Sequence, residues 1–367
     1  MGKRVFIKAL LFFFAVVFVM VFFENSVDNS AMRKVTVEKE ESLLPVKEGQ
    51  DTKDAEKVLD YTEIVVNAVG DCTLGSDEKY SKYGIFDEEL KKQNYDYSYF
   101  FRNVKDTFKK GDLTIANLEG PLTTSTKRAE KEYAFKGHPS YAKILKEGGV
   151  DAVNLANNHS FDYGKEGFYE TVNALKKEGI GYFGYGYRYI TEVKGVKIGV
   201  LGYTGYDDTE WTKQEIKKDI EKLRPEVNIL IVSFHWGEEN KYYPNKIQRN
   251  LGHFAIDEGA DLVIGHHPHV LQGIEKYKAR YIAYSLGNFV FGGNRNPKDK
   301  DSMIFQQIFF VDKEGKVAET KANIIPVSIS SQKDRNDYSP RLLEGEEREK
   351  VLEKIEKLSQ WDKITLE

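Results

Sequence analysis

Short apolar runs that each end in polar residues constrain the fold of this sequence more than any other feature. The runs are rich in β-branched residues and alternate with amphipathic segments, which predicts strands alternating with helices. Two further pairs of runs meet at short turns, around Lys194–Gly195 and Lys313–Gly315, and these predict hairpins. We therefore expect an α/β fold whose sheets also contain antiparallel strands.

The residues that follow the predicted strands are of the types that bind ions and transfer protons. Ligands of α/β sheets bind at the carboxyl ends of the strands, so we expect these side chains to gather at one edge. Five of the 7 histidines lie at such ends. The strand-end residues are Asp71, Asn117, Glu119, Asn157, Asn158, His159, His235, Glu238, His266, His267, His269 and Asn288.

Carboxylate, carboxamide and imidazole groups together are typical ligands of Zn, Fe or Mn. Two such ions about 3.5–4 Å apart clamp a phosphoryl or similar group, and a carboxylate such as Glu119 or Asp71 would bridge them. His267 and His269 point to the same side of an extended segment because one residue separates them. Taken singly, each residue fits a turn or a cap as readily as a ligand. Their number favours a site for one or two divalent ions.

Six stretches, in this order, resemble the CapA-like family of capsule biosynthesis proteins: GDCTLGSD, NLEGPL, NLANNHSFDYG, SFHWGEE, GHHPHVLQG and YSLGNFVF. The resemblance covers roughly residues 63–330. It implies the calcineurin-like metallophosphoesterase fold, a four-layer α/β/β/α sandwich with the site at one edge. It also implies an N-terminal membrane anchor and an association with poly-γ-glutamate synthesis.

The resemblance assigns roles to individual residues of this chain. Its implied metal ligands are Asp71, Glu119, Asn158, His235, His267 and His269, with Asn117 as the alternative to Glu119. It implies that His159 acts on the leaving group, whereas His266 has no clear counterpart. The related phosphoesterases have a histidine where this chain has Thr73, a poor metal ligand. This departure leaves the catalytic competence of the site open.

Other residues are candidates for supporting roles. Asp162 either caps the helix that begins near Lys165 or orients His159 as a neighbouring carboxylate. Asn117, Glu238 and Asn288 follow strands and are candidates to contact substrate. Lys136 would bind an anionic substrate, or is an ordinary surface lysine.

The N-terminal segment 1–23 has a basic start and then an apolar run, Val5 to Phe23, that approaches the roughly 20 residues of a membrane-spanning helix. Its positive flank places the rest of the chain outside the cytoplasm. We predict an uncleaved signal anchor (1–23) over a cleaved signal peptide, because no A-x-A-like cleavage site follows it. A charged linker (24–60), a CapA-like metallophosphoesterase-fold domain (61–335) and a C-terminal helical tail (336–367) are expected to follow. The net charge of −4 gives no basic stripe, so nucleic acid is not an expected partner.

The expected function is that of a single-pass cell-membrane protein whose extracytoplasmic domain assists synthesis or export of an anionic capsule polymer, poly-γ-glutamate. Its expected partners are the membrane-embedded subunits of the polymer synthase or exporter, and its substrate the anionic polymer or a phosphoester. Two alternatives remain open at this point. One is a general cell-surface metallophosphoesterase, and the other is a non-catalytic assembly subunit of the synthase.

Overall fold

The computed structural model describes residues 33–34, 60–83 and 86–359. The predicted membrane anchor and nearly all of the predicted linker lie outside these residues. Across the described ranges, no helix has the length and apolar character needed to cross a bilayer.

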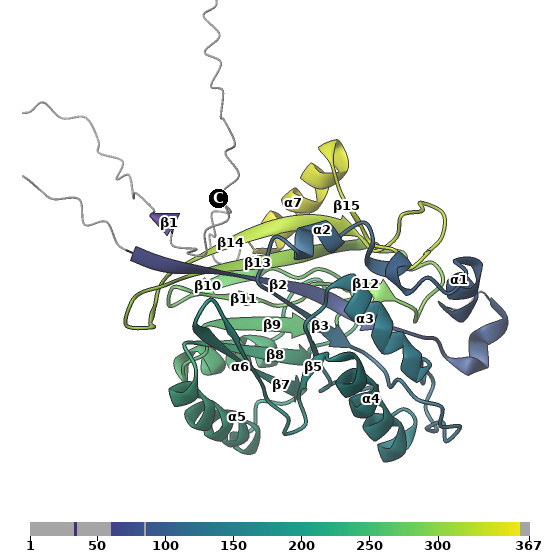
Figure 1. Cartoon of the computed structure of the whole chain (residues 1–367), viewed down its shortest axis with the longest axis horizontal. Helices are drawn as coiled ribbons and strands as arrows, with labels where there is room; N and C mark the ends of the chain where they lie inside the picture. Colours follow the sequence, from purple (N-terminus) through teal and green to yellow (C-terminus); the bar gives the residue numbers. More distant parts are fainter. Residues whose placement is uncertain (1–32, 35–59, 84–85, 360–367) are drawn as a thin grey trace, which may run out of the picture. The chain divides into compact units, whose positions relative to one another are not determined.

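Two sheets form the centre of the described fold, and the larger has nine strands (Figure 1). Strands β2 to β5 pair in parallel, whereas β13, β14 and β15 add antiparallel strands on the other side of β2. Its order is β15 (Arg341–Leu342), β14 (Val317–Ser328), β13 (Asp301–Val311), β2 (Asp60–Thr73), β3 (Leu113–Leu118), β4 (Ala152–Asn154) and β5 (Gly181–Phe183), and β1 (Arg33–Lys34) and β12 (Asn288–Phe291) also pair with β2.

The smaller sheet has six strands. Strands β7, β8, β9 and β11 are parallel, and each edge carries an antiparallel hairpin strand. Its order is β10 (Ile274–Tyr277), β11 (Arg280–Ala283), β9 (Leu262–His266), β8 (Ile229–Trp236), β7 (Val196–Gly205) and β6 (Tyr189–Val193). The predicted mixed α/β fold is therefore confirmed, and the hairpins at Lys194–Gly195 and Lys313–Gly315 join β6 to β7 and β13 to β14.

Helices cover the outer face of each sheet. The larger sheet carries α1 (Phe86–Lys92), α2 (Lys105–Phe108), α3 (Ala142–Gly148) and α4 (Gly164–Glu178), and the smaller carries α5 (Glu210–Leu223) and α6 (Lys246–Asp257). Short 3-10 helices lie at η1 (Glu78–Tyr83), η2 (Tyr97–Phe101), η3 (Pro139–Tyr141) and η4 (Arg224–Glu226).

Three apolar clusters fill the spaces between these elements, and the period-2 alternation of the strands decides which cluster each side chain joins. In β8, Ile229 and Ile231 face the space between the two sheets, whereas Leu230 and Val232 face α5 and α6. The cluster between the sheets also takes in the apolar side of α7 (Gly345–Ser359). The helix of the predicted tail thus packs on the sheets.

Candidate metal site

The carboxyl ends of strands from both sheets meet at one edge. Asp71 lies near the end of β2, Glu119 directly follows β3, and His235 is the second-last residue of β8. The loop after β9 crosses to the other sheet, where the backbone N–H of His267 donates to Asp71 Oδ2 over 3.1 Å. Most of the strand-end residues predicted from the sequence are therefore brought together by the parallel arrangement of the strands.

A glycine before Asp71 allows the close approach that the site requires. A Cβ atom on Gly70 would lie 2.0 Å from the backbone oxygen of Gly287. The absence of a side chain lets the segment leading to Asn288 run against β2, where the N–H of Asp71 donates to the same oxygen over 3.0 Å. Asp71 and Asn288 are consequently held in one cluster.

Glu119 lies at the centre of the site. Its side chain is fully buried, and its Oε1 atom has no hydrogen-bond partner among the described residues. The Nε2 atoms of three imidazoles, from His159, His235 and His269, lie 3.9, 3.7 and 3.8 Å from that oxygen. These distances are too long for hydrogen bonds, and they are close to the separation of two ligands that contact one ion at about 2.1 Å each.

A first possible ion position is formed by Asp71, Glu119 and His269, which offer ligand atoms within 4.8 Å of one another. Burial lowers the pKa of His269, but the carboxylates of Glu119 and Asp71 outweigh burial and raise it to about 10. The two carboxylates thus attract a positive charge to this position. A divalent ion would replace that proton.

A second possible position is formed by Glu119, His235 and His267. Burial lowers the pKa of His267 to about 4 and that of His235 well below its ordinary value, so both rings are neutral near pH 7, as metal ligands must be. The Oδ1 atom of Asn158 lies 2.9 Å from His235 Nε2, close enough for both atoms to contact one ion. The Nδ1 atom of His267 is buried without a hydrogen-bond partner in the described chain.

The donor set therefore fits one or two divalent ions. Buried polar atoms are nearly always hydrogen-bonded in folded proteins, yet Glu119 Oε1 and His267 Nδ1 are not. Burial raises the pKa of Glu119 to about 7, which reflects the cost of a buried carboxylate without enough positive charge around it. Oxygen and imidazole ligands together suit Zn, Mn or Fe.

Side chains around the ligands fix their orientation. The amide of Asn117 donates to Asp71 Oδ1 over 2.9 Å, and its own oxygen accepts from Asn154. Asn288 contacts His269 twice, with Oδ1 at 2.9 Å from Nδ1 and Nδ2 donating to the backbone oxygen over 3.2 Å. Both residues were predicted to contact substrate. The structure places both beside metal-ligand candidates, and Asn288 also lines the neighbouring cleft.

His159 is positioned by a carboxylate and a lysine. Its Nδ1 lies 2.6 Å from Asp162 Oδ2, which leaves Nε2 pointing toward Glu119. Lys131 donates to Asp162 Oδ1 over 2.7 Å and to the backbone oxygen of Asn158 over 3.0 Å. Of the two roles predicted for Asp162, the contacts support the orientation of His159, since the helix α4 has no side-chain cap.

The turn that carries His159 depends on the preceding asparagine. Asn157 donates through Nδ2 to the backbone oxygen of Leu118 over 2.8 Å, which ties the turn to the end of β3. Its Oδ1 accepts from the N–H of His159 over 3.1 Å. Asn157 therefore shapes the turn, while Asn158 and His159 face the site.

Two residues predicted to contact substrate lie away from the ligand cluster. Lys136 pairs with Glu78 at 2.7 Å and lies over the ring of Tyr163, so its ammonium group is directed elsewhere. Glu238 and Glu239 are both exposed, and it is Glu239 that comes within ligand distance of His267 and His269. Sequence reasoning missed Lys131 and Glu239 because both lie in loops without a periodic pattern.

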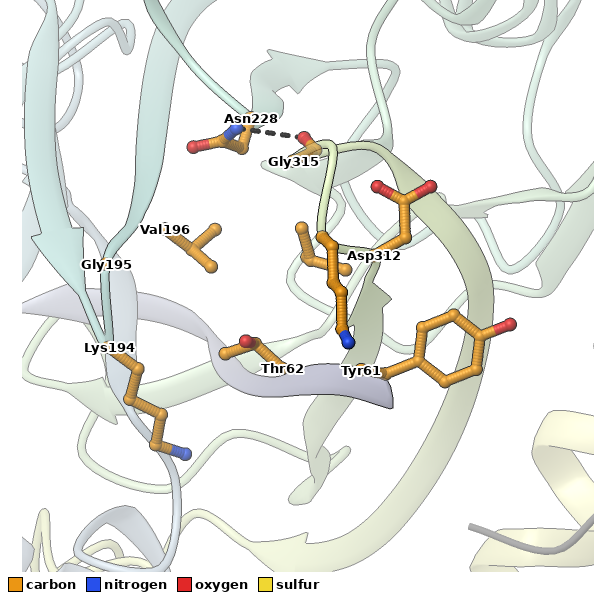
Figure 2. A pocket seen from close by; sticks show the side chains of 10 residues that line it. Tyr61, Thr62, Lys194, Gly195, Val196, Asn228, Asp312 and Gly315 are labelled. Atoms are coloured by element: carbon orange, nitrogen blue, oxygen red, sulfur yellow. Dashed lines mark hydrogen bonds between the residues drawn. The ribbon is translucent and has the colours of Figure 1, made fainter. Parts of the chain in front are cut away.

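A cleft of about 470 Å³ opens onto the site. His159, His269, Asn288 and Glu239 line its inner part, and aromatic side chains, including Tyr133 and Phe135, line its walls. Another pocket, of about 350 Å³, lies beside Tyr61 and Thr62 at the opposite end of β2 (Figure 2). Among the described residues that line this second pocket, none is a metal-ligand candidate. The cleft beside His159 and His269 is therefore the candidate substrate site.

Comparisons with known proteins identify relatives of this chain. The chain is 30% identical to the capsule biosynthesis protein CapA of Bacillus anthracis over 299 residues, which cover 74% of this chain and 67% of the relative. It is 32% identical to the PGA biosynthesis protein CapA of Bacillus subtilis (strain 168), covering 64% of this chain and 66% of the relative. A probable polyglutamine synthesis accessory protein of Mycobacterium tuberculosis is 26% identical, covering 49% of this chain and 55% of that protein.

The chain thus spans about two thirds of the length of the two CapA relatives. A family model described as bacterial capsule synthesis protein PGA_cap matches residues 65–293. That range includes all six metal-ligand candidates as well as His159 and Asp162. Because the match extends over more than half of the sequence, the chain belongs to the family of bacterial capsule synthesis proteins.

Proposed function

We propose that this protein is an accessory factor for the synthesis or export of an anionic capsule polymer, poly-γ-glutamate, and that it carries a metal-dependent hydrolase-like site. The names of the CapA relatives support the polymer. We also propose that the site lies in a membrane-anchored, extracytoplasmic domain of metallophosphoesterase type. This placement rests on the apolar segment 1–23 and on the strand-end motifs.

One observation carries the metal-dependent part of the proposal. The buried Oε1 of Glu119, without a hydrogen-bond partner in the described chain, faces three imidazole Nε2 atoms at 3.7–3.9 Å. Asp71, Glu119 and His269 would hold one ion, and Glu119, Asn158, His235 and His267 another. Divalent ions bound there would polarise the scissile bond and lower the pKa of bound water.

The chain's own residues would supply the proton transfer. The contact between Nδ1 of His159 and Asp162 fixes the ring, so Nε2 is the atom that would carry a proton to the leaving group. Lys131 holds Asp162 from its other oxygen and so fixes the pair. The substrate bond is an amide of the polymer or a phosphoester, both of which need a proton on the departing group.

The test is complementation of a polymer-producing host from which the resident family member has been deleted. We expect wild-type chain to restore polymer, and His267→Ala and His159→Ala to fail at equal protein level. Normal polymer with both variants would contradict the metal-dependent site and would favour a non-catalytic assembly subunit.

A general cell-surface phosphoesterase remains a second candidate, because His159 and the two possible ion positions are the parts that phosphoester hydrolysis needs. Purified full-length protein with added Mn²⁺ would then hydrolyse a chromogenic phosphate ester, and His159→Ala would not. Restoration of polymer without any such hydrolysis would favour the polymer-specific function.

A further inference from the structure

A third group of possible ligands overlaps the two ion positions. Glu239, His267 and His269 offer ligand atoms that all lie within 4.8 Å of one another. His269 belongs to the first position and His267 to the second. The carboxylate of Glu239 therefore lies beside one imidazole from each position, whereas Glu119 joins the two positions from the buried side.

The loop that carries Glu239 is tied to the histidine loop. The N–H of Asn240 donates to the backbone oxygen of Pro268, between the two histidines, over 2.8 Å. Gln272 then donates through Nε2 to the backbone oxygen of Lys241 over 2.8 Å. These two bonds, made by the residues directly after Glu239, hold this part of the loop beside His267 and His269.

His267 gives an independent indication of a ligand at this place. Its side chain is 8% exposed, its Nδ1 has no hydrogen-bond partner among the described residues, and its backbone φ is 96°. A residue other than glycine adopts such a positive φ at an energetic cost, which proteins tolerate mainly at functional sites. The backbone conformation of His267 and its unpartnered Nδ1 are therefore two features that stability alone does not explain.

The charges of the site leave room for another carboxylate. Two divalent ions bring four positive charges, and Asp71 and Glu119 offset two of them. Thr73 occupies the position where related phosphoesterases have a histidine, and its hydroxyl contacts Glu119 Oε2 at 3.4 Å. The first position is thus short of one ligand, and Glu239 is a carboxylate that lines the cleft beside His267 and His269.

We infer that Glu239 is a metal ligand that closes the site from the cleft side and is shared by the two ion positions. This inference rests on the proposed metal site. Glu239 supplies the ligand and the negative charge that Thr73 does not, so the ion-binding set is Asp71, Glu119, Asn158, His235, His267, His269 and Glu239.

The test is calorimetric titration of full-length protein in detergent with MnCl₂, after removal of bound metal by a chelator. Glu239→Gln keeps the size of the side chain and removes its charge, and Glu238→Gln is the matched control on the neighbouring exposed residue. We expect Glu239→Gln to weaken the most weakly bound ion at least tenfold, in line with the effect of losing a metal-orienting group. Glu238→Gln should bind as wild type does.

Glu239→Asp provides a second measurement, because it keeps the carboxylate on a shorter side chain and should restore part of the lost affinity. Equal affinities of wild type and Glu239→Gln would overturn the role of Glu239 while leaving the metal site intact. Equal losses in Glu238→Gln and Glu239→Gln would also overturn it, since general surface charge would then explain the effect. A wild-type chain that binds no Mn²⁺ would overturn both this inference and the proposed function.

Discussion

Replacement of Asp162 by Asn tests how the site residue His159 is held. Asp162 is 1% exposed and accepts three hydrogen bonds. They come from the N–H of Phe135 at 2.7 Å, Nδ1 of His159 at 2.6 Å and Nζ of Lys131 at 2.7 Å. Asparagine offers one oxygen and one NH₂ group, so in either orientation its NH₂ faces a donor.

The expected loss of stability follows from these contacts. A hydrogen bond to a charged group contributes about 1.5–3 kcal/mol and a neutral one about 0.5–1.5 kcal/mol. In the better orientation, the asparagine oxygen faces the N–H of Phe135 and Nδ1 of His159. Those two hydrogen bonds then change from charged to neutral, and each contributes about 1 kcal/mol less. The Lys131 bond is lost, but this side chain is 33% exposed and regains water, so its share is small. We expect Asp162→Asn to lower the free energy of unfolding by about 2–3 kcal/mol.

Urea denaturation of the metal-free protein at pH 7 measures this loss. With a slope of about 1–3 kcal/mol per molar urea, the midpoint should fall by about 1 M. Asp106→Asn is the control, because Asp106 is exposed and its ion pair with Lys109 lies at the surface, so its midpoint should equal that of wild type. An unchanged midpoint for Asp162→Asn would refute the account of how His159 is held.

Three further outcomes follow from the same geometry. Burial raises the pKa of Glu119 to about 7 from 4.5, so its proton stabilises the metal-free fold below about pH 4.5, and this stabilisation is lost as the pH rises through 7. Wild type should therefore lose stability relative to Glu119→Gln between pH 5 and 8, measured by urea midpoints. Gly70→Ala should cost about 2 kcal/mol or more, since its methyl group meets the Gly287 oxygen. A divalent ion at about 100 times its Kd should stabilise the chain by about 2.7 kcal/mol in thermal unfolding, and His235→Ala should abolish this gain.

The position of the site was predictable because strand direction is encoded locally. Asp71, Glu119 and His235 each follow a β-branched run, and parallel pairing places all such ends at one edge. The near-continuous apolar run of β8 is likewise typical of a strand buried on both faces. Such features depend on a few neighbouring residues, so a single sequence contains them.

The loops around the site were not predictable in the same way. Lys136 was a candidate for substrate binding, yet it is Lys131 that reaches Asp162, because the path of this loop depends on contacts with distant residues such as Glu78. Glu238 and Glu239 cannot be ranked from sequence, since the backbone bond between Asn240 and Pro268 decides which one faces the histidines. These distant contacts have no periodic signal.

The buried polar groups connect the stability of this chain with its function. Glu119 Oε1 and His267 Nδ1 are buried without hydrogen-bond partners among the described residues, and each such group costs about 1–3 kcal/mol. A chain selected for stability alone would replace them with apolar side chains. Their cost is offset when an ion binds, because the ion contacts the same atoms. The ion-free fold should therefore be the less stable form, and Glu119→Gln should stabilise it near pH 8 while abolishing its response to metal.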